Sequence, residues 1–132
     1  MNVYRLPRRV AIVGSRAFPD PDKVRHLIRR LPYDTIVVTG DADAGVDVWV
    51  REEARALGLV VEVYEADWKT HGRRAGFLRN GVVVENSEFM FAFWDEVSPG
   101  TADAAYQAQS AGLPVVVVRA DSEVPMVEAG DR

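Results

Sequence analysis

Short apolar runs alternate with amphipathic segments along this chain, and this alternation constrains the fold more than any other feature. The apolar runs cover residues 10–13, 35–38, 60–64, 89–94 and 114–118. Apolar residues at helical spacing fall between them, over residues 20–31, 48–57, 75–86 and 102–111. Unbroken apolar runs are typical of strands that are buried on both faces, and helices are the usual connections between parallel strands. The sequence therefore predicts an α/β fold, a single Rossmann-like domain with a mostly parallel five-stranded sheet and helices on both faces.

The length of 132 residues suits one domain. We expect this domain over residues 9–119, after an N-terminal extension at residues 1–8. Residues 120–132 are acidic and show no periodicity, so we expect a tail that is either disordered or docked on a partner subunit.

Composition narrows the possible functions. The chain has no cysteine and only two histidines, so we expect no metal site, and we expect no cofactor. No apolar run approaches the roughly 18 residues of a membrane span, and we expect a cytoplasmic protein without a membrane partner. The net charge of −4 leads us to expect that nucleic acid is an unlikely partner and that a small anionic molecule is the ligand.

Four polar, glycine-containing loops follow the predicted strands, over residues 14–18, 40–47, 67–74 and 94–101. The carboxyl ends of parallel strands meet at one edge of the sheet, where open α/β folds bind their ligands. Gly14 allows a sharp turn, and Arg16 offers a guanidinium suited to phosphate. Thr101 can cap the helix that follows it, and the free N–H groups of that helix can bind an anion. The loops together predict an anion-binding site at this edge.

Six motifs occur in a fixed order between residues 9 and 118: Gly14-Ser15-Arg16-x-Phe18, Val38-Thr39-Gly40 with Gly45-Val46-Asp47, Ala66-Asp67-Trp68-x-x-His71-Gly72, Ala75-Gly76-x-x-Arg79-Asn80, Ala92-Phe93-Trp94-Asp95 and Ser98-Pro99-Gly100-Thr101. Together they resemble the YspA-like (cpYpsA-related) branch of the SLOG superfamily, formerly a domain of unknown function. That superfamily also contains the Lonely-guy phosphoribohydrolases and the Smf/DprA proteins. The resemblance implies a Rossmann-like fold that binds nucleotides or nucleotide-derived molecules, and a homodimer or higher homo-oligomer.

The resemblance also implies a set of ligand-binding residues: Gly14, Ser15, Arg16, Gly40, Asp47, Arg79, Asn80, Ser98, Gly100 and Thr101. Arg79 falls where the phosphoribohydrolases have an arginine that takes part in hydrolysis. Their motif has a glutamate three residues after its Gly-Thr, where this chain has Ala104, with Asp103 one position earlier. A shift of one residue turns a helical side chain by about 100°, so Asp103 is expected to point in a different direction from that glutamate. The loop at residues 40–47 is also one residue longer than usual, and Asp41 replaces a glycine.

Three functions are open at this stage. The first is binding of a nucleotide or nucleotide-derived ligand at the C-terminal edge of the sheet, as a sensor or ligand-processing domain. The alternative is a phosphoribohydrolase-like enzyme that cleaves the N-glycosidic bond of a nucleoside monophosphate, with Arg79 and Asp103 as catalytic residues. Asp95 or Asp47 could supply the acid in place of Asp103. The second alternative is a single-stranded DNA-binding protein that uses Arg73, Arg74 and Arg79 with Trp68 for stacking.

Overall fold

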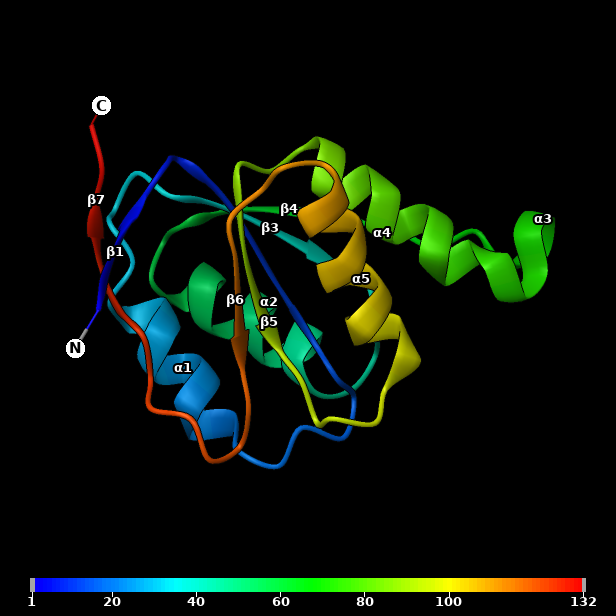
Figure 1. The fold of residues 1–132 in the computed structure, drawn as a ribbon, viewed down its shortest axis with the longest axis horizontal. Helices are drawn as coiled ribbons and strands as arrows, with labels where there is room; N and C mark the ends of the chain where they lie inside the picture. The colour runs from blue at the N-terminus through cyan, green and yellow to red at the C-terminus, as the bar shows by residue number, and fades with distance from the viewer. Residues whose placement is uncertain (1, 132) are drawn as a thin grey trace.

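The main sheet has five strands, all parallel, in the order β4-β3-β2-β5-β6 (Figure 1). The computed structural model describes residues 2–131, so Met1 and Arg132, the outer ends of the expected extension and tail, lie outside it. The strands are β2 (Arg9–Gly14), β3 (Ile36–Gly40), β4 (Val60–Tyr64), β5 (Phe89–Phe93) and β6 (Val115–Val118). The predicted α/β fold with a five-stranded parallel sheet is confirmed.

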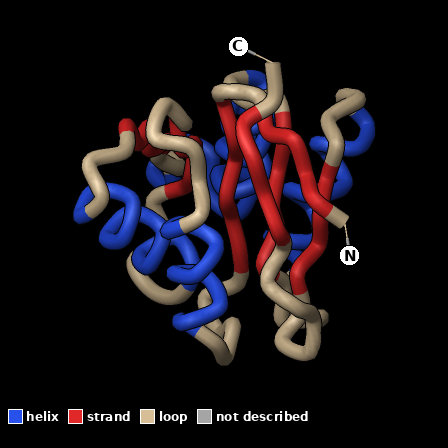
Figure 2. The backbone as a smooth tube through the Cα atoms, turned by 90° about the vertical axis from the view of Figure 1, so that its left-hand side faces the viewer, coloured by secondary structure: helices blue, strands red, loops and turns tan. Residues whose placement is uncertain are grey.

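Two pairs of helices cover the two faces of this sheet (Figures 1 and 2). Residues of α1 (Pro21–Arg29) and α2 (Val46–Ala56) form one core cluster with alternate residues of the strands, including Val10 and Ile12 of β2. Residues of α4 (Ala75–Glu85) and α5 (Pro99–Ser110) form a second cluster with the strand residues between them, including Ala11 and Val13. Successive strand residues point to opposite faces, so β2 and β5 are buried from both sides.

The chain reverses its direction of travel across the sheet next to β2. From β2 it moves outward through β3 to β4, and it then returns to β5 on the other side of β2. The helix after β2 and the helix after β5 therefore lie on opposite faces, and their connecting loops separate to leave a crevice, as in other open α/β folds. Gly14 ends β2 at this point. A Cβ atom there would lie 2.5 Å from the Phe93 carbonyl oxygen and 2.7 Å from Val46, so only glycine fits.

The ends of the chain form a second, two-stranded sheet. β1 (Val3–Leu6) pairs in parallel with β7 (Met126–Ala129), and Figure 1 shows the two strands side by side near the termini. The segment expected as a disordered or partner-docked tail thus contains a strand. Four residues are too few to show a period in the sequence, and the partner strand is more than 100 residues away. The division of the chain at residues 8 and 119 stays a prediction.

Two other expectations need correction. The segment at residues 67–74 was expected as a loop, but it forms α3 (Trp68–His71) and the 3₁₀ helix η1 (Gly72–Arg74), which lead into α4 and lie at its far end from the sheet (Figure 1). Asp67 starts α3, because its carboxylate accepts a hydrogen bond from the Thr70 amide at 3.1 Å. The last helix begins at Pro99 rather than at residue 102, since proline is favoured at the first helical position. None of the helices in the described part of the chain has the length and apolar character to cross a membrane.

Candidate functional site

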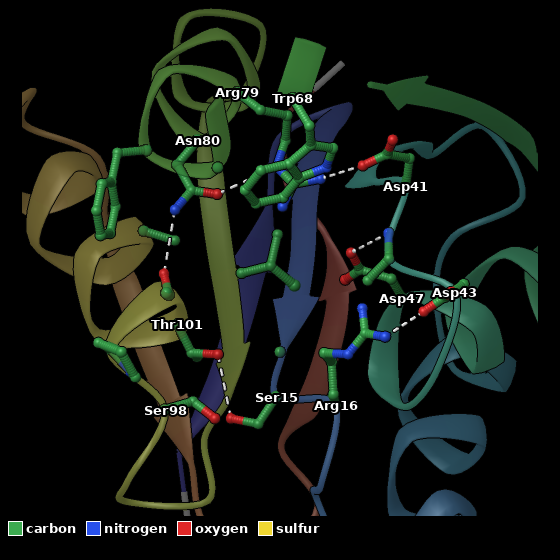
Figure 3. Close-up of a pocket in the computed structure, with 18 of the residues that line it drawn as sticks. Ser15, Arg16, Asp41, Asp43, Asp47, Trp68, Arg79, Asn80, Ser98 and Thr101 are labelled. Atoms are coloured by element: carbon green, nitrogen blue, oxygen red, sulfur yellow. Dashed lines mark hydrogen bonds and ion pairs between the residues drawn. The ribbon is translucent and has the colours of Figure 1, made fainter. Parts of the chain in front are cut away.

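A cleft of about 540 Å³ opens at the crevice beside β2 (Figure 3). It contains nine of the ten expected ligand-binding residues, the exception being Gly40. Its lining consists of Val13, Gly14, Ser15, Arg16, Asp41, Ala42, Asp43, Asp47, Trp68, Arg73, Gly76, Phe77, Arg79, Asn80, Ser98, Pro99, Gly100, Thr101 and Ala104. Figure 3 shows Ser98, Thr101 and Asn80 on one wall and Arg16, Asp43 and Asp47 on the other.

The first turn of α5 forms one wall of the cleft. Ser98 occupies the N-cap position, but no side chain caps the helix. Pro99 has no N–H group, so the amides of Gly100 and Thr101 are the first backbone donors of the helix, and they have no partner within it. The positive end of the helix dipole adds to these donors. This wall is therefore suited to an anion such as phosphate.

Asp95 organises the loop that leads into α5. Its carboxylate accepts hydrogen bonds from the Val97 amide at 2.9 Å, the Ser98 amide at 2.7 Å and the Ser98 hydroxyl at 2.9 Å. Burial tends to raise the pKa of Asp95, but the bonds from Ser98 and Val97 outweigh it and lower this pKa below its usual range. Trp94 Nε1 donates to the Ser98 carbonyl oxygen at 3.0 Å and holds the same loop from the other side.

The hydroxyl groups of Ser15 and Thr101 are directed at each other. They are 3.1 Å apart, and the Ser15 oxygen also accepts a bond from the Asp95 amide at 3.1 Å. Both residues are buried. These hydroxyls therefore join the end of β2 to the start of α5 and stabilise the wall, while the backbone of α5 presents its donors to the cleft.

Two arginines reach the opposite side of the cleft, and each is already paired. Arg16 forms an exposed ion pair with Asp43. Arg79 Nη1 lies 2.6 Å from Asp41 Oδ1 in a more buried pair. The Asp41 carboxylate also accepts a bond from the Ala66 amide at 3.2 Å, which fixes that pair further. Arg16 is the cation that can exchange its partner at low cost, because exposed ion pairs contribute only about 0–1 kcal/mol.

Asp47 is a buried residue of this second wall. It accepts bonds from the Thr39 hydroxyl at 3.4 Å and the Ala42 amide at 3.3 Å, so it fixes the loop after β3. Burial raises the pKa of Asp47, and the nearby positive charge of Arg79 opposes this shift. Gly40 does not line the cleft, but its lack of a side chain leaves room for Arg79 and Asp47. A Cβ atom at Gly40 would lie 2.5 Å from Arg79 Nη1 and 2.7 Å from Asp47 Oδ2.

Asn80 connects Arg79 to the α5 wall. Its Nδ2 donates to the Gly100 carbonyl oxygen and to Asp103 Oδ2, both at 3.1 Å, and its Oδ1 accepts from Arg79 Nε at 3.3 Å. Gln107 Nε2 also donates to Asp103 Oδ2, at 2.7 Å. Of the two residues proposed to be catalytic, Arg79 lines the cleft and Asp103 does not, since Ala104 occupies the facing position.

An exposed surface of aromatic and cationic side chains borders the cleft. This basic-aromatic rim consists of Trp68, Arg73 and Phe77, which line the cleft, and of their exposed neighbours in the chain, Lys69 and Arg74. Trp68 is 58% exposed and Phe77 46% exposed. The three cations of the rim have no ion-pair partner among residues 2–131. Over the same residues, no three histidine, cysteine, aspartate or glutamate side chains group together to hold a metal ion.

Sequence reasoning missed the two ion pairs, Phe77 and the partners of Asp103. The ion pairs could have been predicted, because the acidic loop at residues 40–47 was already expected at the same edge of the sheet as Arg16. No sequence feature marked Phe77 as a cleft residue, because an apolar residue at a helical position is more often part of a core.

Comparison with known proteins places these features in context. The chain is 36% identical over 120 residues to the gene 61 protein of Mycobacterium phage D29, and the match covers 83% of this chain and 94% of that protein. No protein-family model matches the chain. Its fold is similar to that of DNA processing protein A from Helicobacter pylori, in a structure concerned with the single-stranded DNA binding mode of that protein, with a TM-score of 0.63 and 22% identity. The likeness covers 85% of this chain, which spans 65% of the length of that structure.

This likeness shows that the chain shares its fold with DNA processing protein A, and it overturns one expectation. The expectation that nucleic acid is an unlikely partner is wrong, because a protein of this fold binds single-stranded DNA. That expectation depended on a net charge of −4, and a net charge does not report where the cations are.

Proposed function

Because the chain belongs to the family of the gene 61 protein of Mycobacterium phage D29 and has an Smf/DprA-type fold, we propose that it binds single-stranded DNA with one nucleotide seated in the cleft. The observation that carries this proposal is the uncapped first turn of α5 facing a guanidinium across a cleft bordered by the basic-aromatic rim. A cleft of about 540 Å³ is within the usual range of small-ligand sites, roughly 300–1,000 Å³, and suits a nucleotide.

The phosphate of this nucleotide lies at the start of α5. The amides of Gly100 and Thr101 donate to it, and Arg16 leaves Asp43 to form charge-assisted bonds with it. Arg79 stays with Asp41, because that pair is the more buried of the two, and the pair keeps the loop after β3 in place.

The base of the same nucleotide stacks on the rim. Trp68 offers an exposed ring over the cleft, and every base has a face that can stack on such a ring. The strand continues along Lys69, Arg73 and Arg74, whose charges neutralise further phosphates. Stacking and phosphate contacts of this kind bind single strands with little sequence preference.

The contacts give the phosphoribohydrolase alternative less support. Cleavage of an N-glycosidic bond needs a carboxylate beside the ribose to stabilise the charge that develops there. Asp103 is held by Asn80 and Gln107, and Ala104 takes its place on the cleft wall.

The resemblance of the six motifs further supports membership of the YspA-like branch, and it also underlies our proposal of a homo-oligomer. A cytoplasmic location rests on composition alone.

Fluorescence anisotropy with a labelled oligo(dT) tests the proposal. We expect Trp68→Ala to weaken binding about tenfold, since a stacked base contributes roughly 1–3 kcal/mol. Arg73→Gln should reduce the slope of log K against log salt concentration by about one, the value expected for one lost phosphate contact. Arg55→Gln on α2, an exposed arginine outside the cleft lining, is the matched control and should leave both quantities unchanged. Absence of binding at low salt, or equal affinities for wild type and Trp68→Ala, would contradict the proposal.

A further inference from the structure

A second hollow of about 220 Å³ lies on the other side of the start of α5, between that helix and the edge strand β6. Trp94, Tyr106 and Arg119 contribute its largest side chains. Thr101 lines both this hollow and the cleft, so the two meet at the first turn of α5. Thr101 is therefore the residue of that uncapped turn which the two adjoining depressions share.

The second hollow is too small for a nucleotide and has the chemistry to hold a base. Its volume of about 220 Å³ is below the roughly 300 Å³ at which small-ligand sites usually begin. Tyr106 is 69% exposed, and neither it nor Trp94 has a stacking partner among the aromatic rings of residues 2–131. A tyrosine exposed in this way has a ring face free for a planar group.

Arg119 adds a planar cation beside these rings. Its Nε lies 3.2 Å from Glu96 in an exposed pair, so the guanidinium can leave that partner at low cost. Guanidinium groups stack on planar rings and also bind phosphate, and both contacts occur in single-strand binding.

We propose that this hollow is a second base subsite, which takes the nucleoside next to the one in the cleft along the same strand. The inference rests on the proposed function. A phosphate within a strand carries a nucleoside on each side, and Thr101 at the uncapped start of α5 lines both hollows, with Gly100 next to it in the cleft. One nucleoside extends into the cleft towards Trp68, and its neighbour extends into the second hollow towards Tyr106.

The experiment compares the dinucleotide dTpdT with the mononucleotide dTMP by isothermal titration calorimetry. The quantity of interest is the ratio of the two affinities, because only the dinucleotide reaches both hollows. We expect Tyr106→Ala to lower this ratio about tenfold and Tyr106→Phe, which keeps the ring, to preserve it. Tyr33→Ala removes a tyrosine that is 92% exposed and lines neither hollow, and it should leave the ratio unchanged.

The outcomes separate this inference from the function beneath it. If wild type binds both ligands and Tyr106→Ala has the wild-type ratio, the second subsite is wrong and the cleft remains. If Tyr106→Phe lowers the ratio as much as Tyr106→Ala, stacking on the ring is not the cause and the inference also fails. If wild type binds neither ligand, both proposals fall together.

Discussion

Replacement of Asp95 by alanine tests whether one carboxylate holds the α5 wall in place. The change removes the only acceptor for the Ser98 hydroxyl and for the amides of Val97 and Ser98 among the side-chain bonds of this loop. Hydrogen bonds to a charged group contribute about 1.5–3 kcal/mol each, and loss of a helix cap costs roughly 0.5–2 kcal/mol. The three bonds share one acceptor, and the exposed Val97 amide can bond to water instead. We therefore expect a loss of about 2 kcal/mol.

Urea unfolding measures this loss. For an m-value of about 2 kcal/mol/M, the midpoint of Asp95→Ala should fall by about 1 M. Asp95→Asn is the matched control, because an amide oxygen can still accept from both amides, which share Oδ1, and its NH₂ group can donate to the Ser98 hydroxyl oxygen. We expect less than half the alanine effect. Oligo(dT) binding should weaken in Asp95→Ala as the first turn of α5 loses its orientation.

The pH dependence provides an independent check on Asp95. Its pKa is lower in the folded protein than the ordinary value of 3.8, so the carboxylate contributes stability above pH 3.8 that is lost as the pH falls through the folded pKa. The stability difference between wild type and Asp95→Ala should therefore shrink below pH 3.8. The reasoning is refuted if Asp95→Ala unfolds within 0.5 kcal/mol of wild type at pH 7, a value typical of a neutral surface change, or if alanine and asparagine have equal effects.

Two further substitutions probe the acidic side of the cleft. Asp43→Asn should tighten oligo(dT) binding about two- to fivefold, because it frees Arg16 from an exposed pair worth about 0–1 kcal/mol; the control Asp22→Asn, whose residue pairs with Arg25, should change nothing. Burial raises the pKa of Asp47 in the folded protein above the ordinary value of 3.8, so the folded state binds more protons than the unfolded state above that pH. The stability of the wild-type protein should therefore fall as the pH rises from 3.8 through the folded pKa. Asp47→Asn should remove that decline in urea unfolding at several pH values, and an unchanged decline would show that Asp47 is not its source.

The sequence predicted the main sheet well, because each of its strands is dominated by apolar residues, although β4 has Glu62 at its centre. Strands buried on both faces leave this pattern even without an alignment. The pairing of β1 with β7 could not be predicted, since Met126–Ala129 is short and bonds to a strand at the other end of the chain. The start of α5 was misplaced because Thr101 is a good N-cap residue, yet Pro99 favours an earlier start.

The position of the cleft was also predictable, because the carboxyl ends of parallel strands must meet at one edge. The side-chain contacts of the cleft could not be predicted from the sequence. The bond between Ser15 and Thr101 depends on side-chain distances that no pattern reports. The place of Asp103 followed in part from helical phase, since a shift of one residue turns the side chain by about 100°. Net charge misled the expectation about nucleic acid, because the cations of the basic-aromatic rim have no ion-pair partner among residues 2–131, although the chain is acidic as a whole.

The most direct test of the central claim is a titration of the ¹⁵N-labelled protein with oligo(dT), followed through its backbone amide resonances. The proposed site predicts the largest shift changes at Gly100 and Thr101, whose amides donate to the phosphate, together with changes at Arg16 and at the indole N–H of Trp68. The account is contradicted if oligo(dT) binds while the Gly100 and Thr101 resonances stay in place and the shifts gather on another face of the protein.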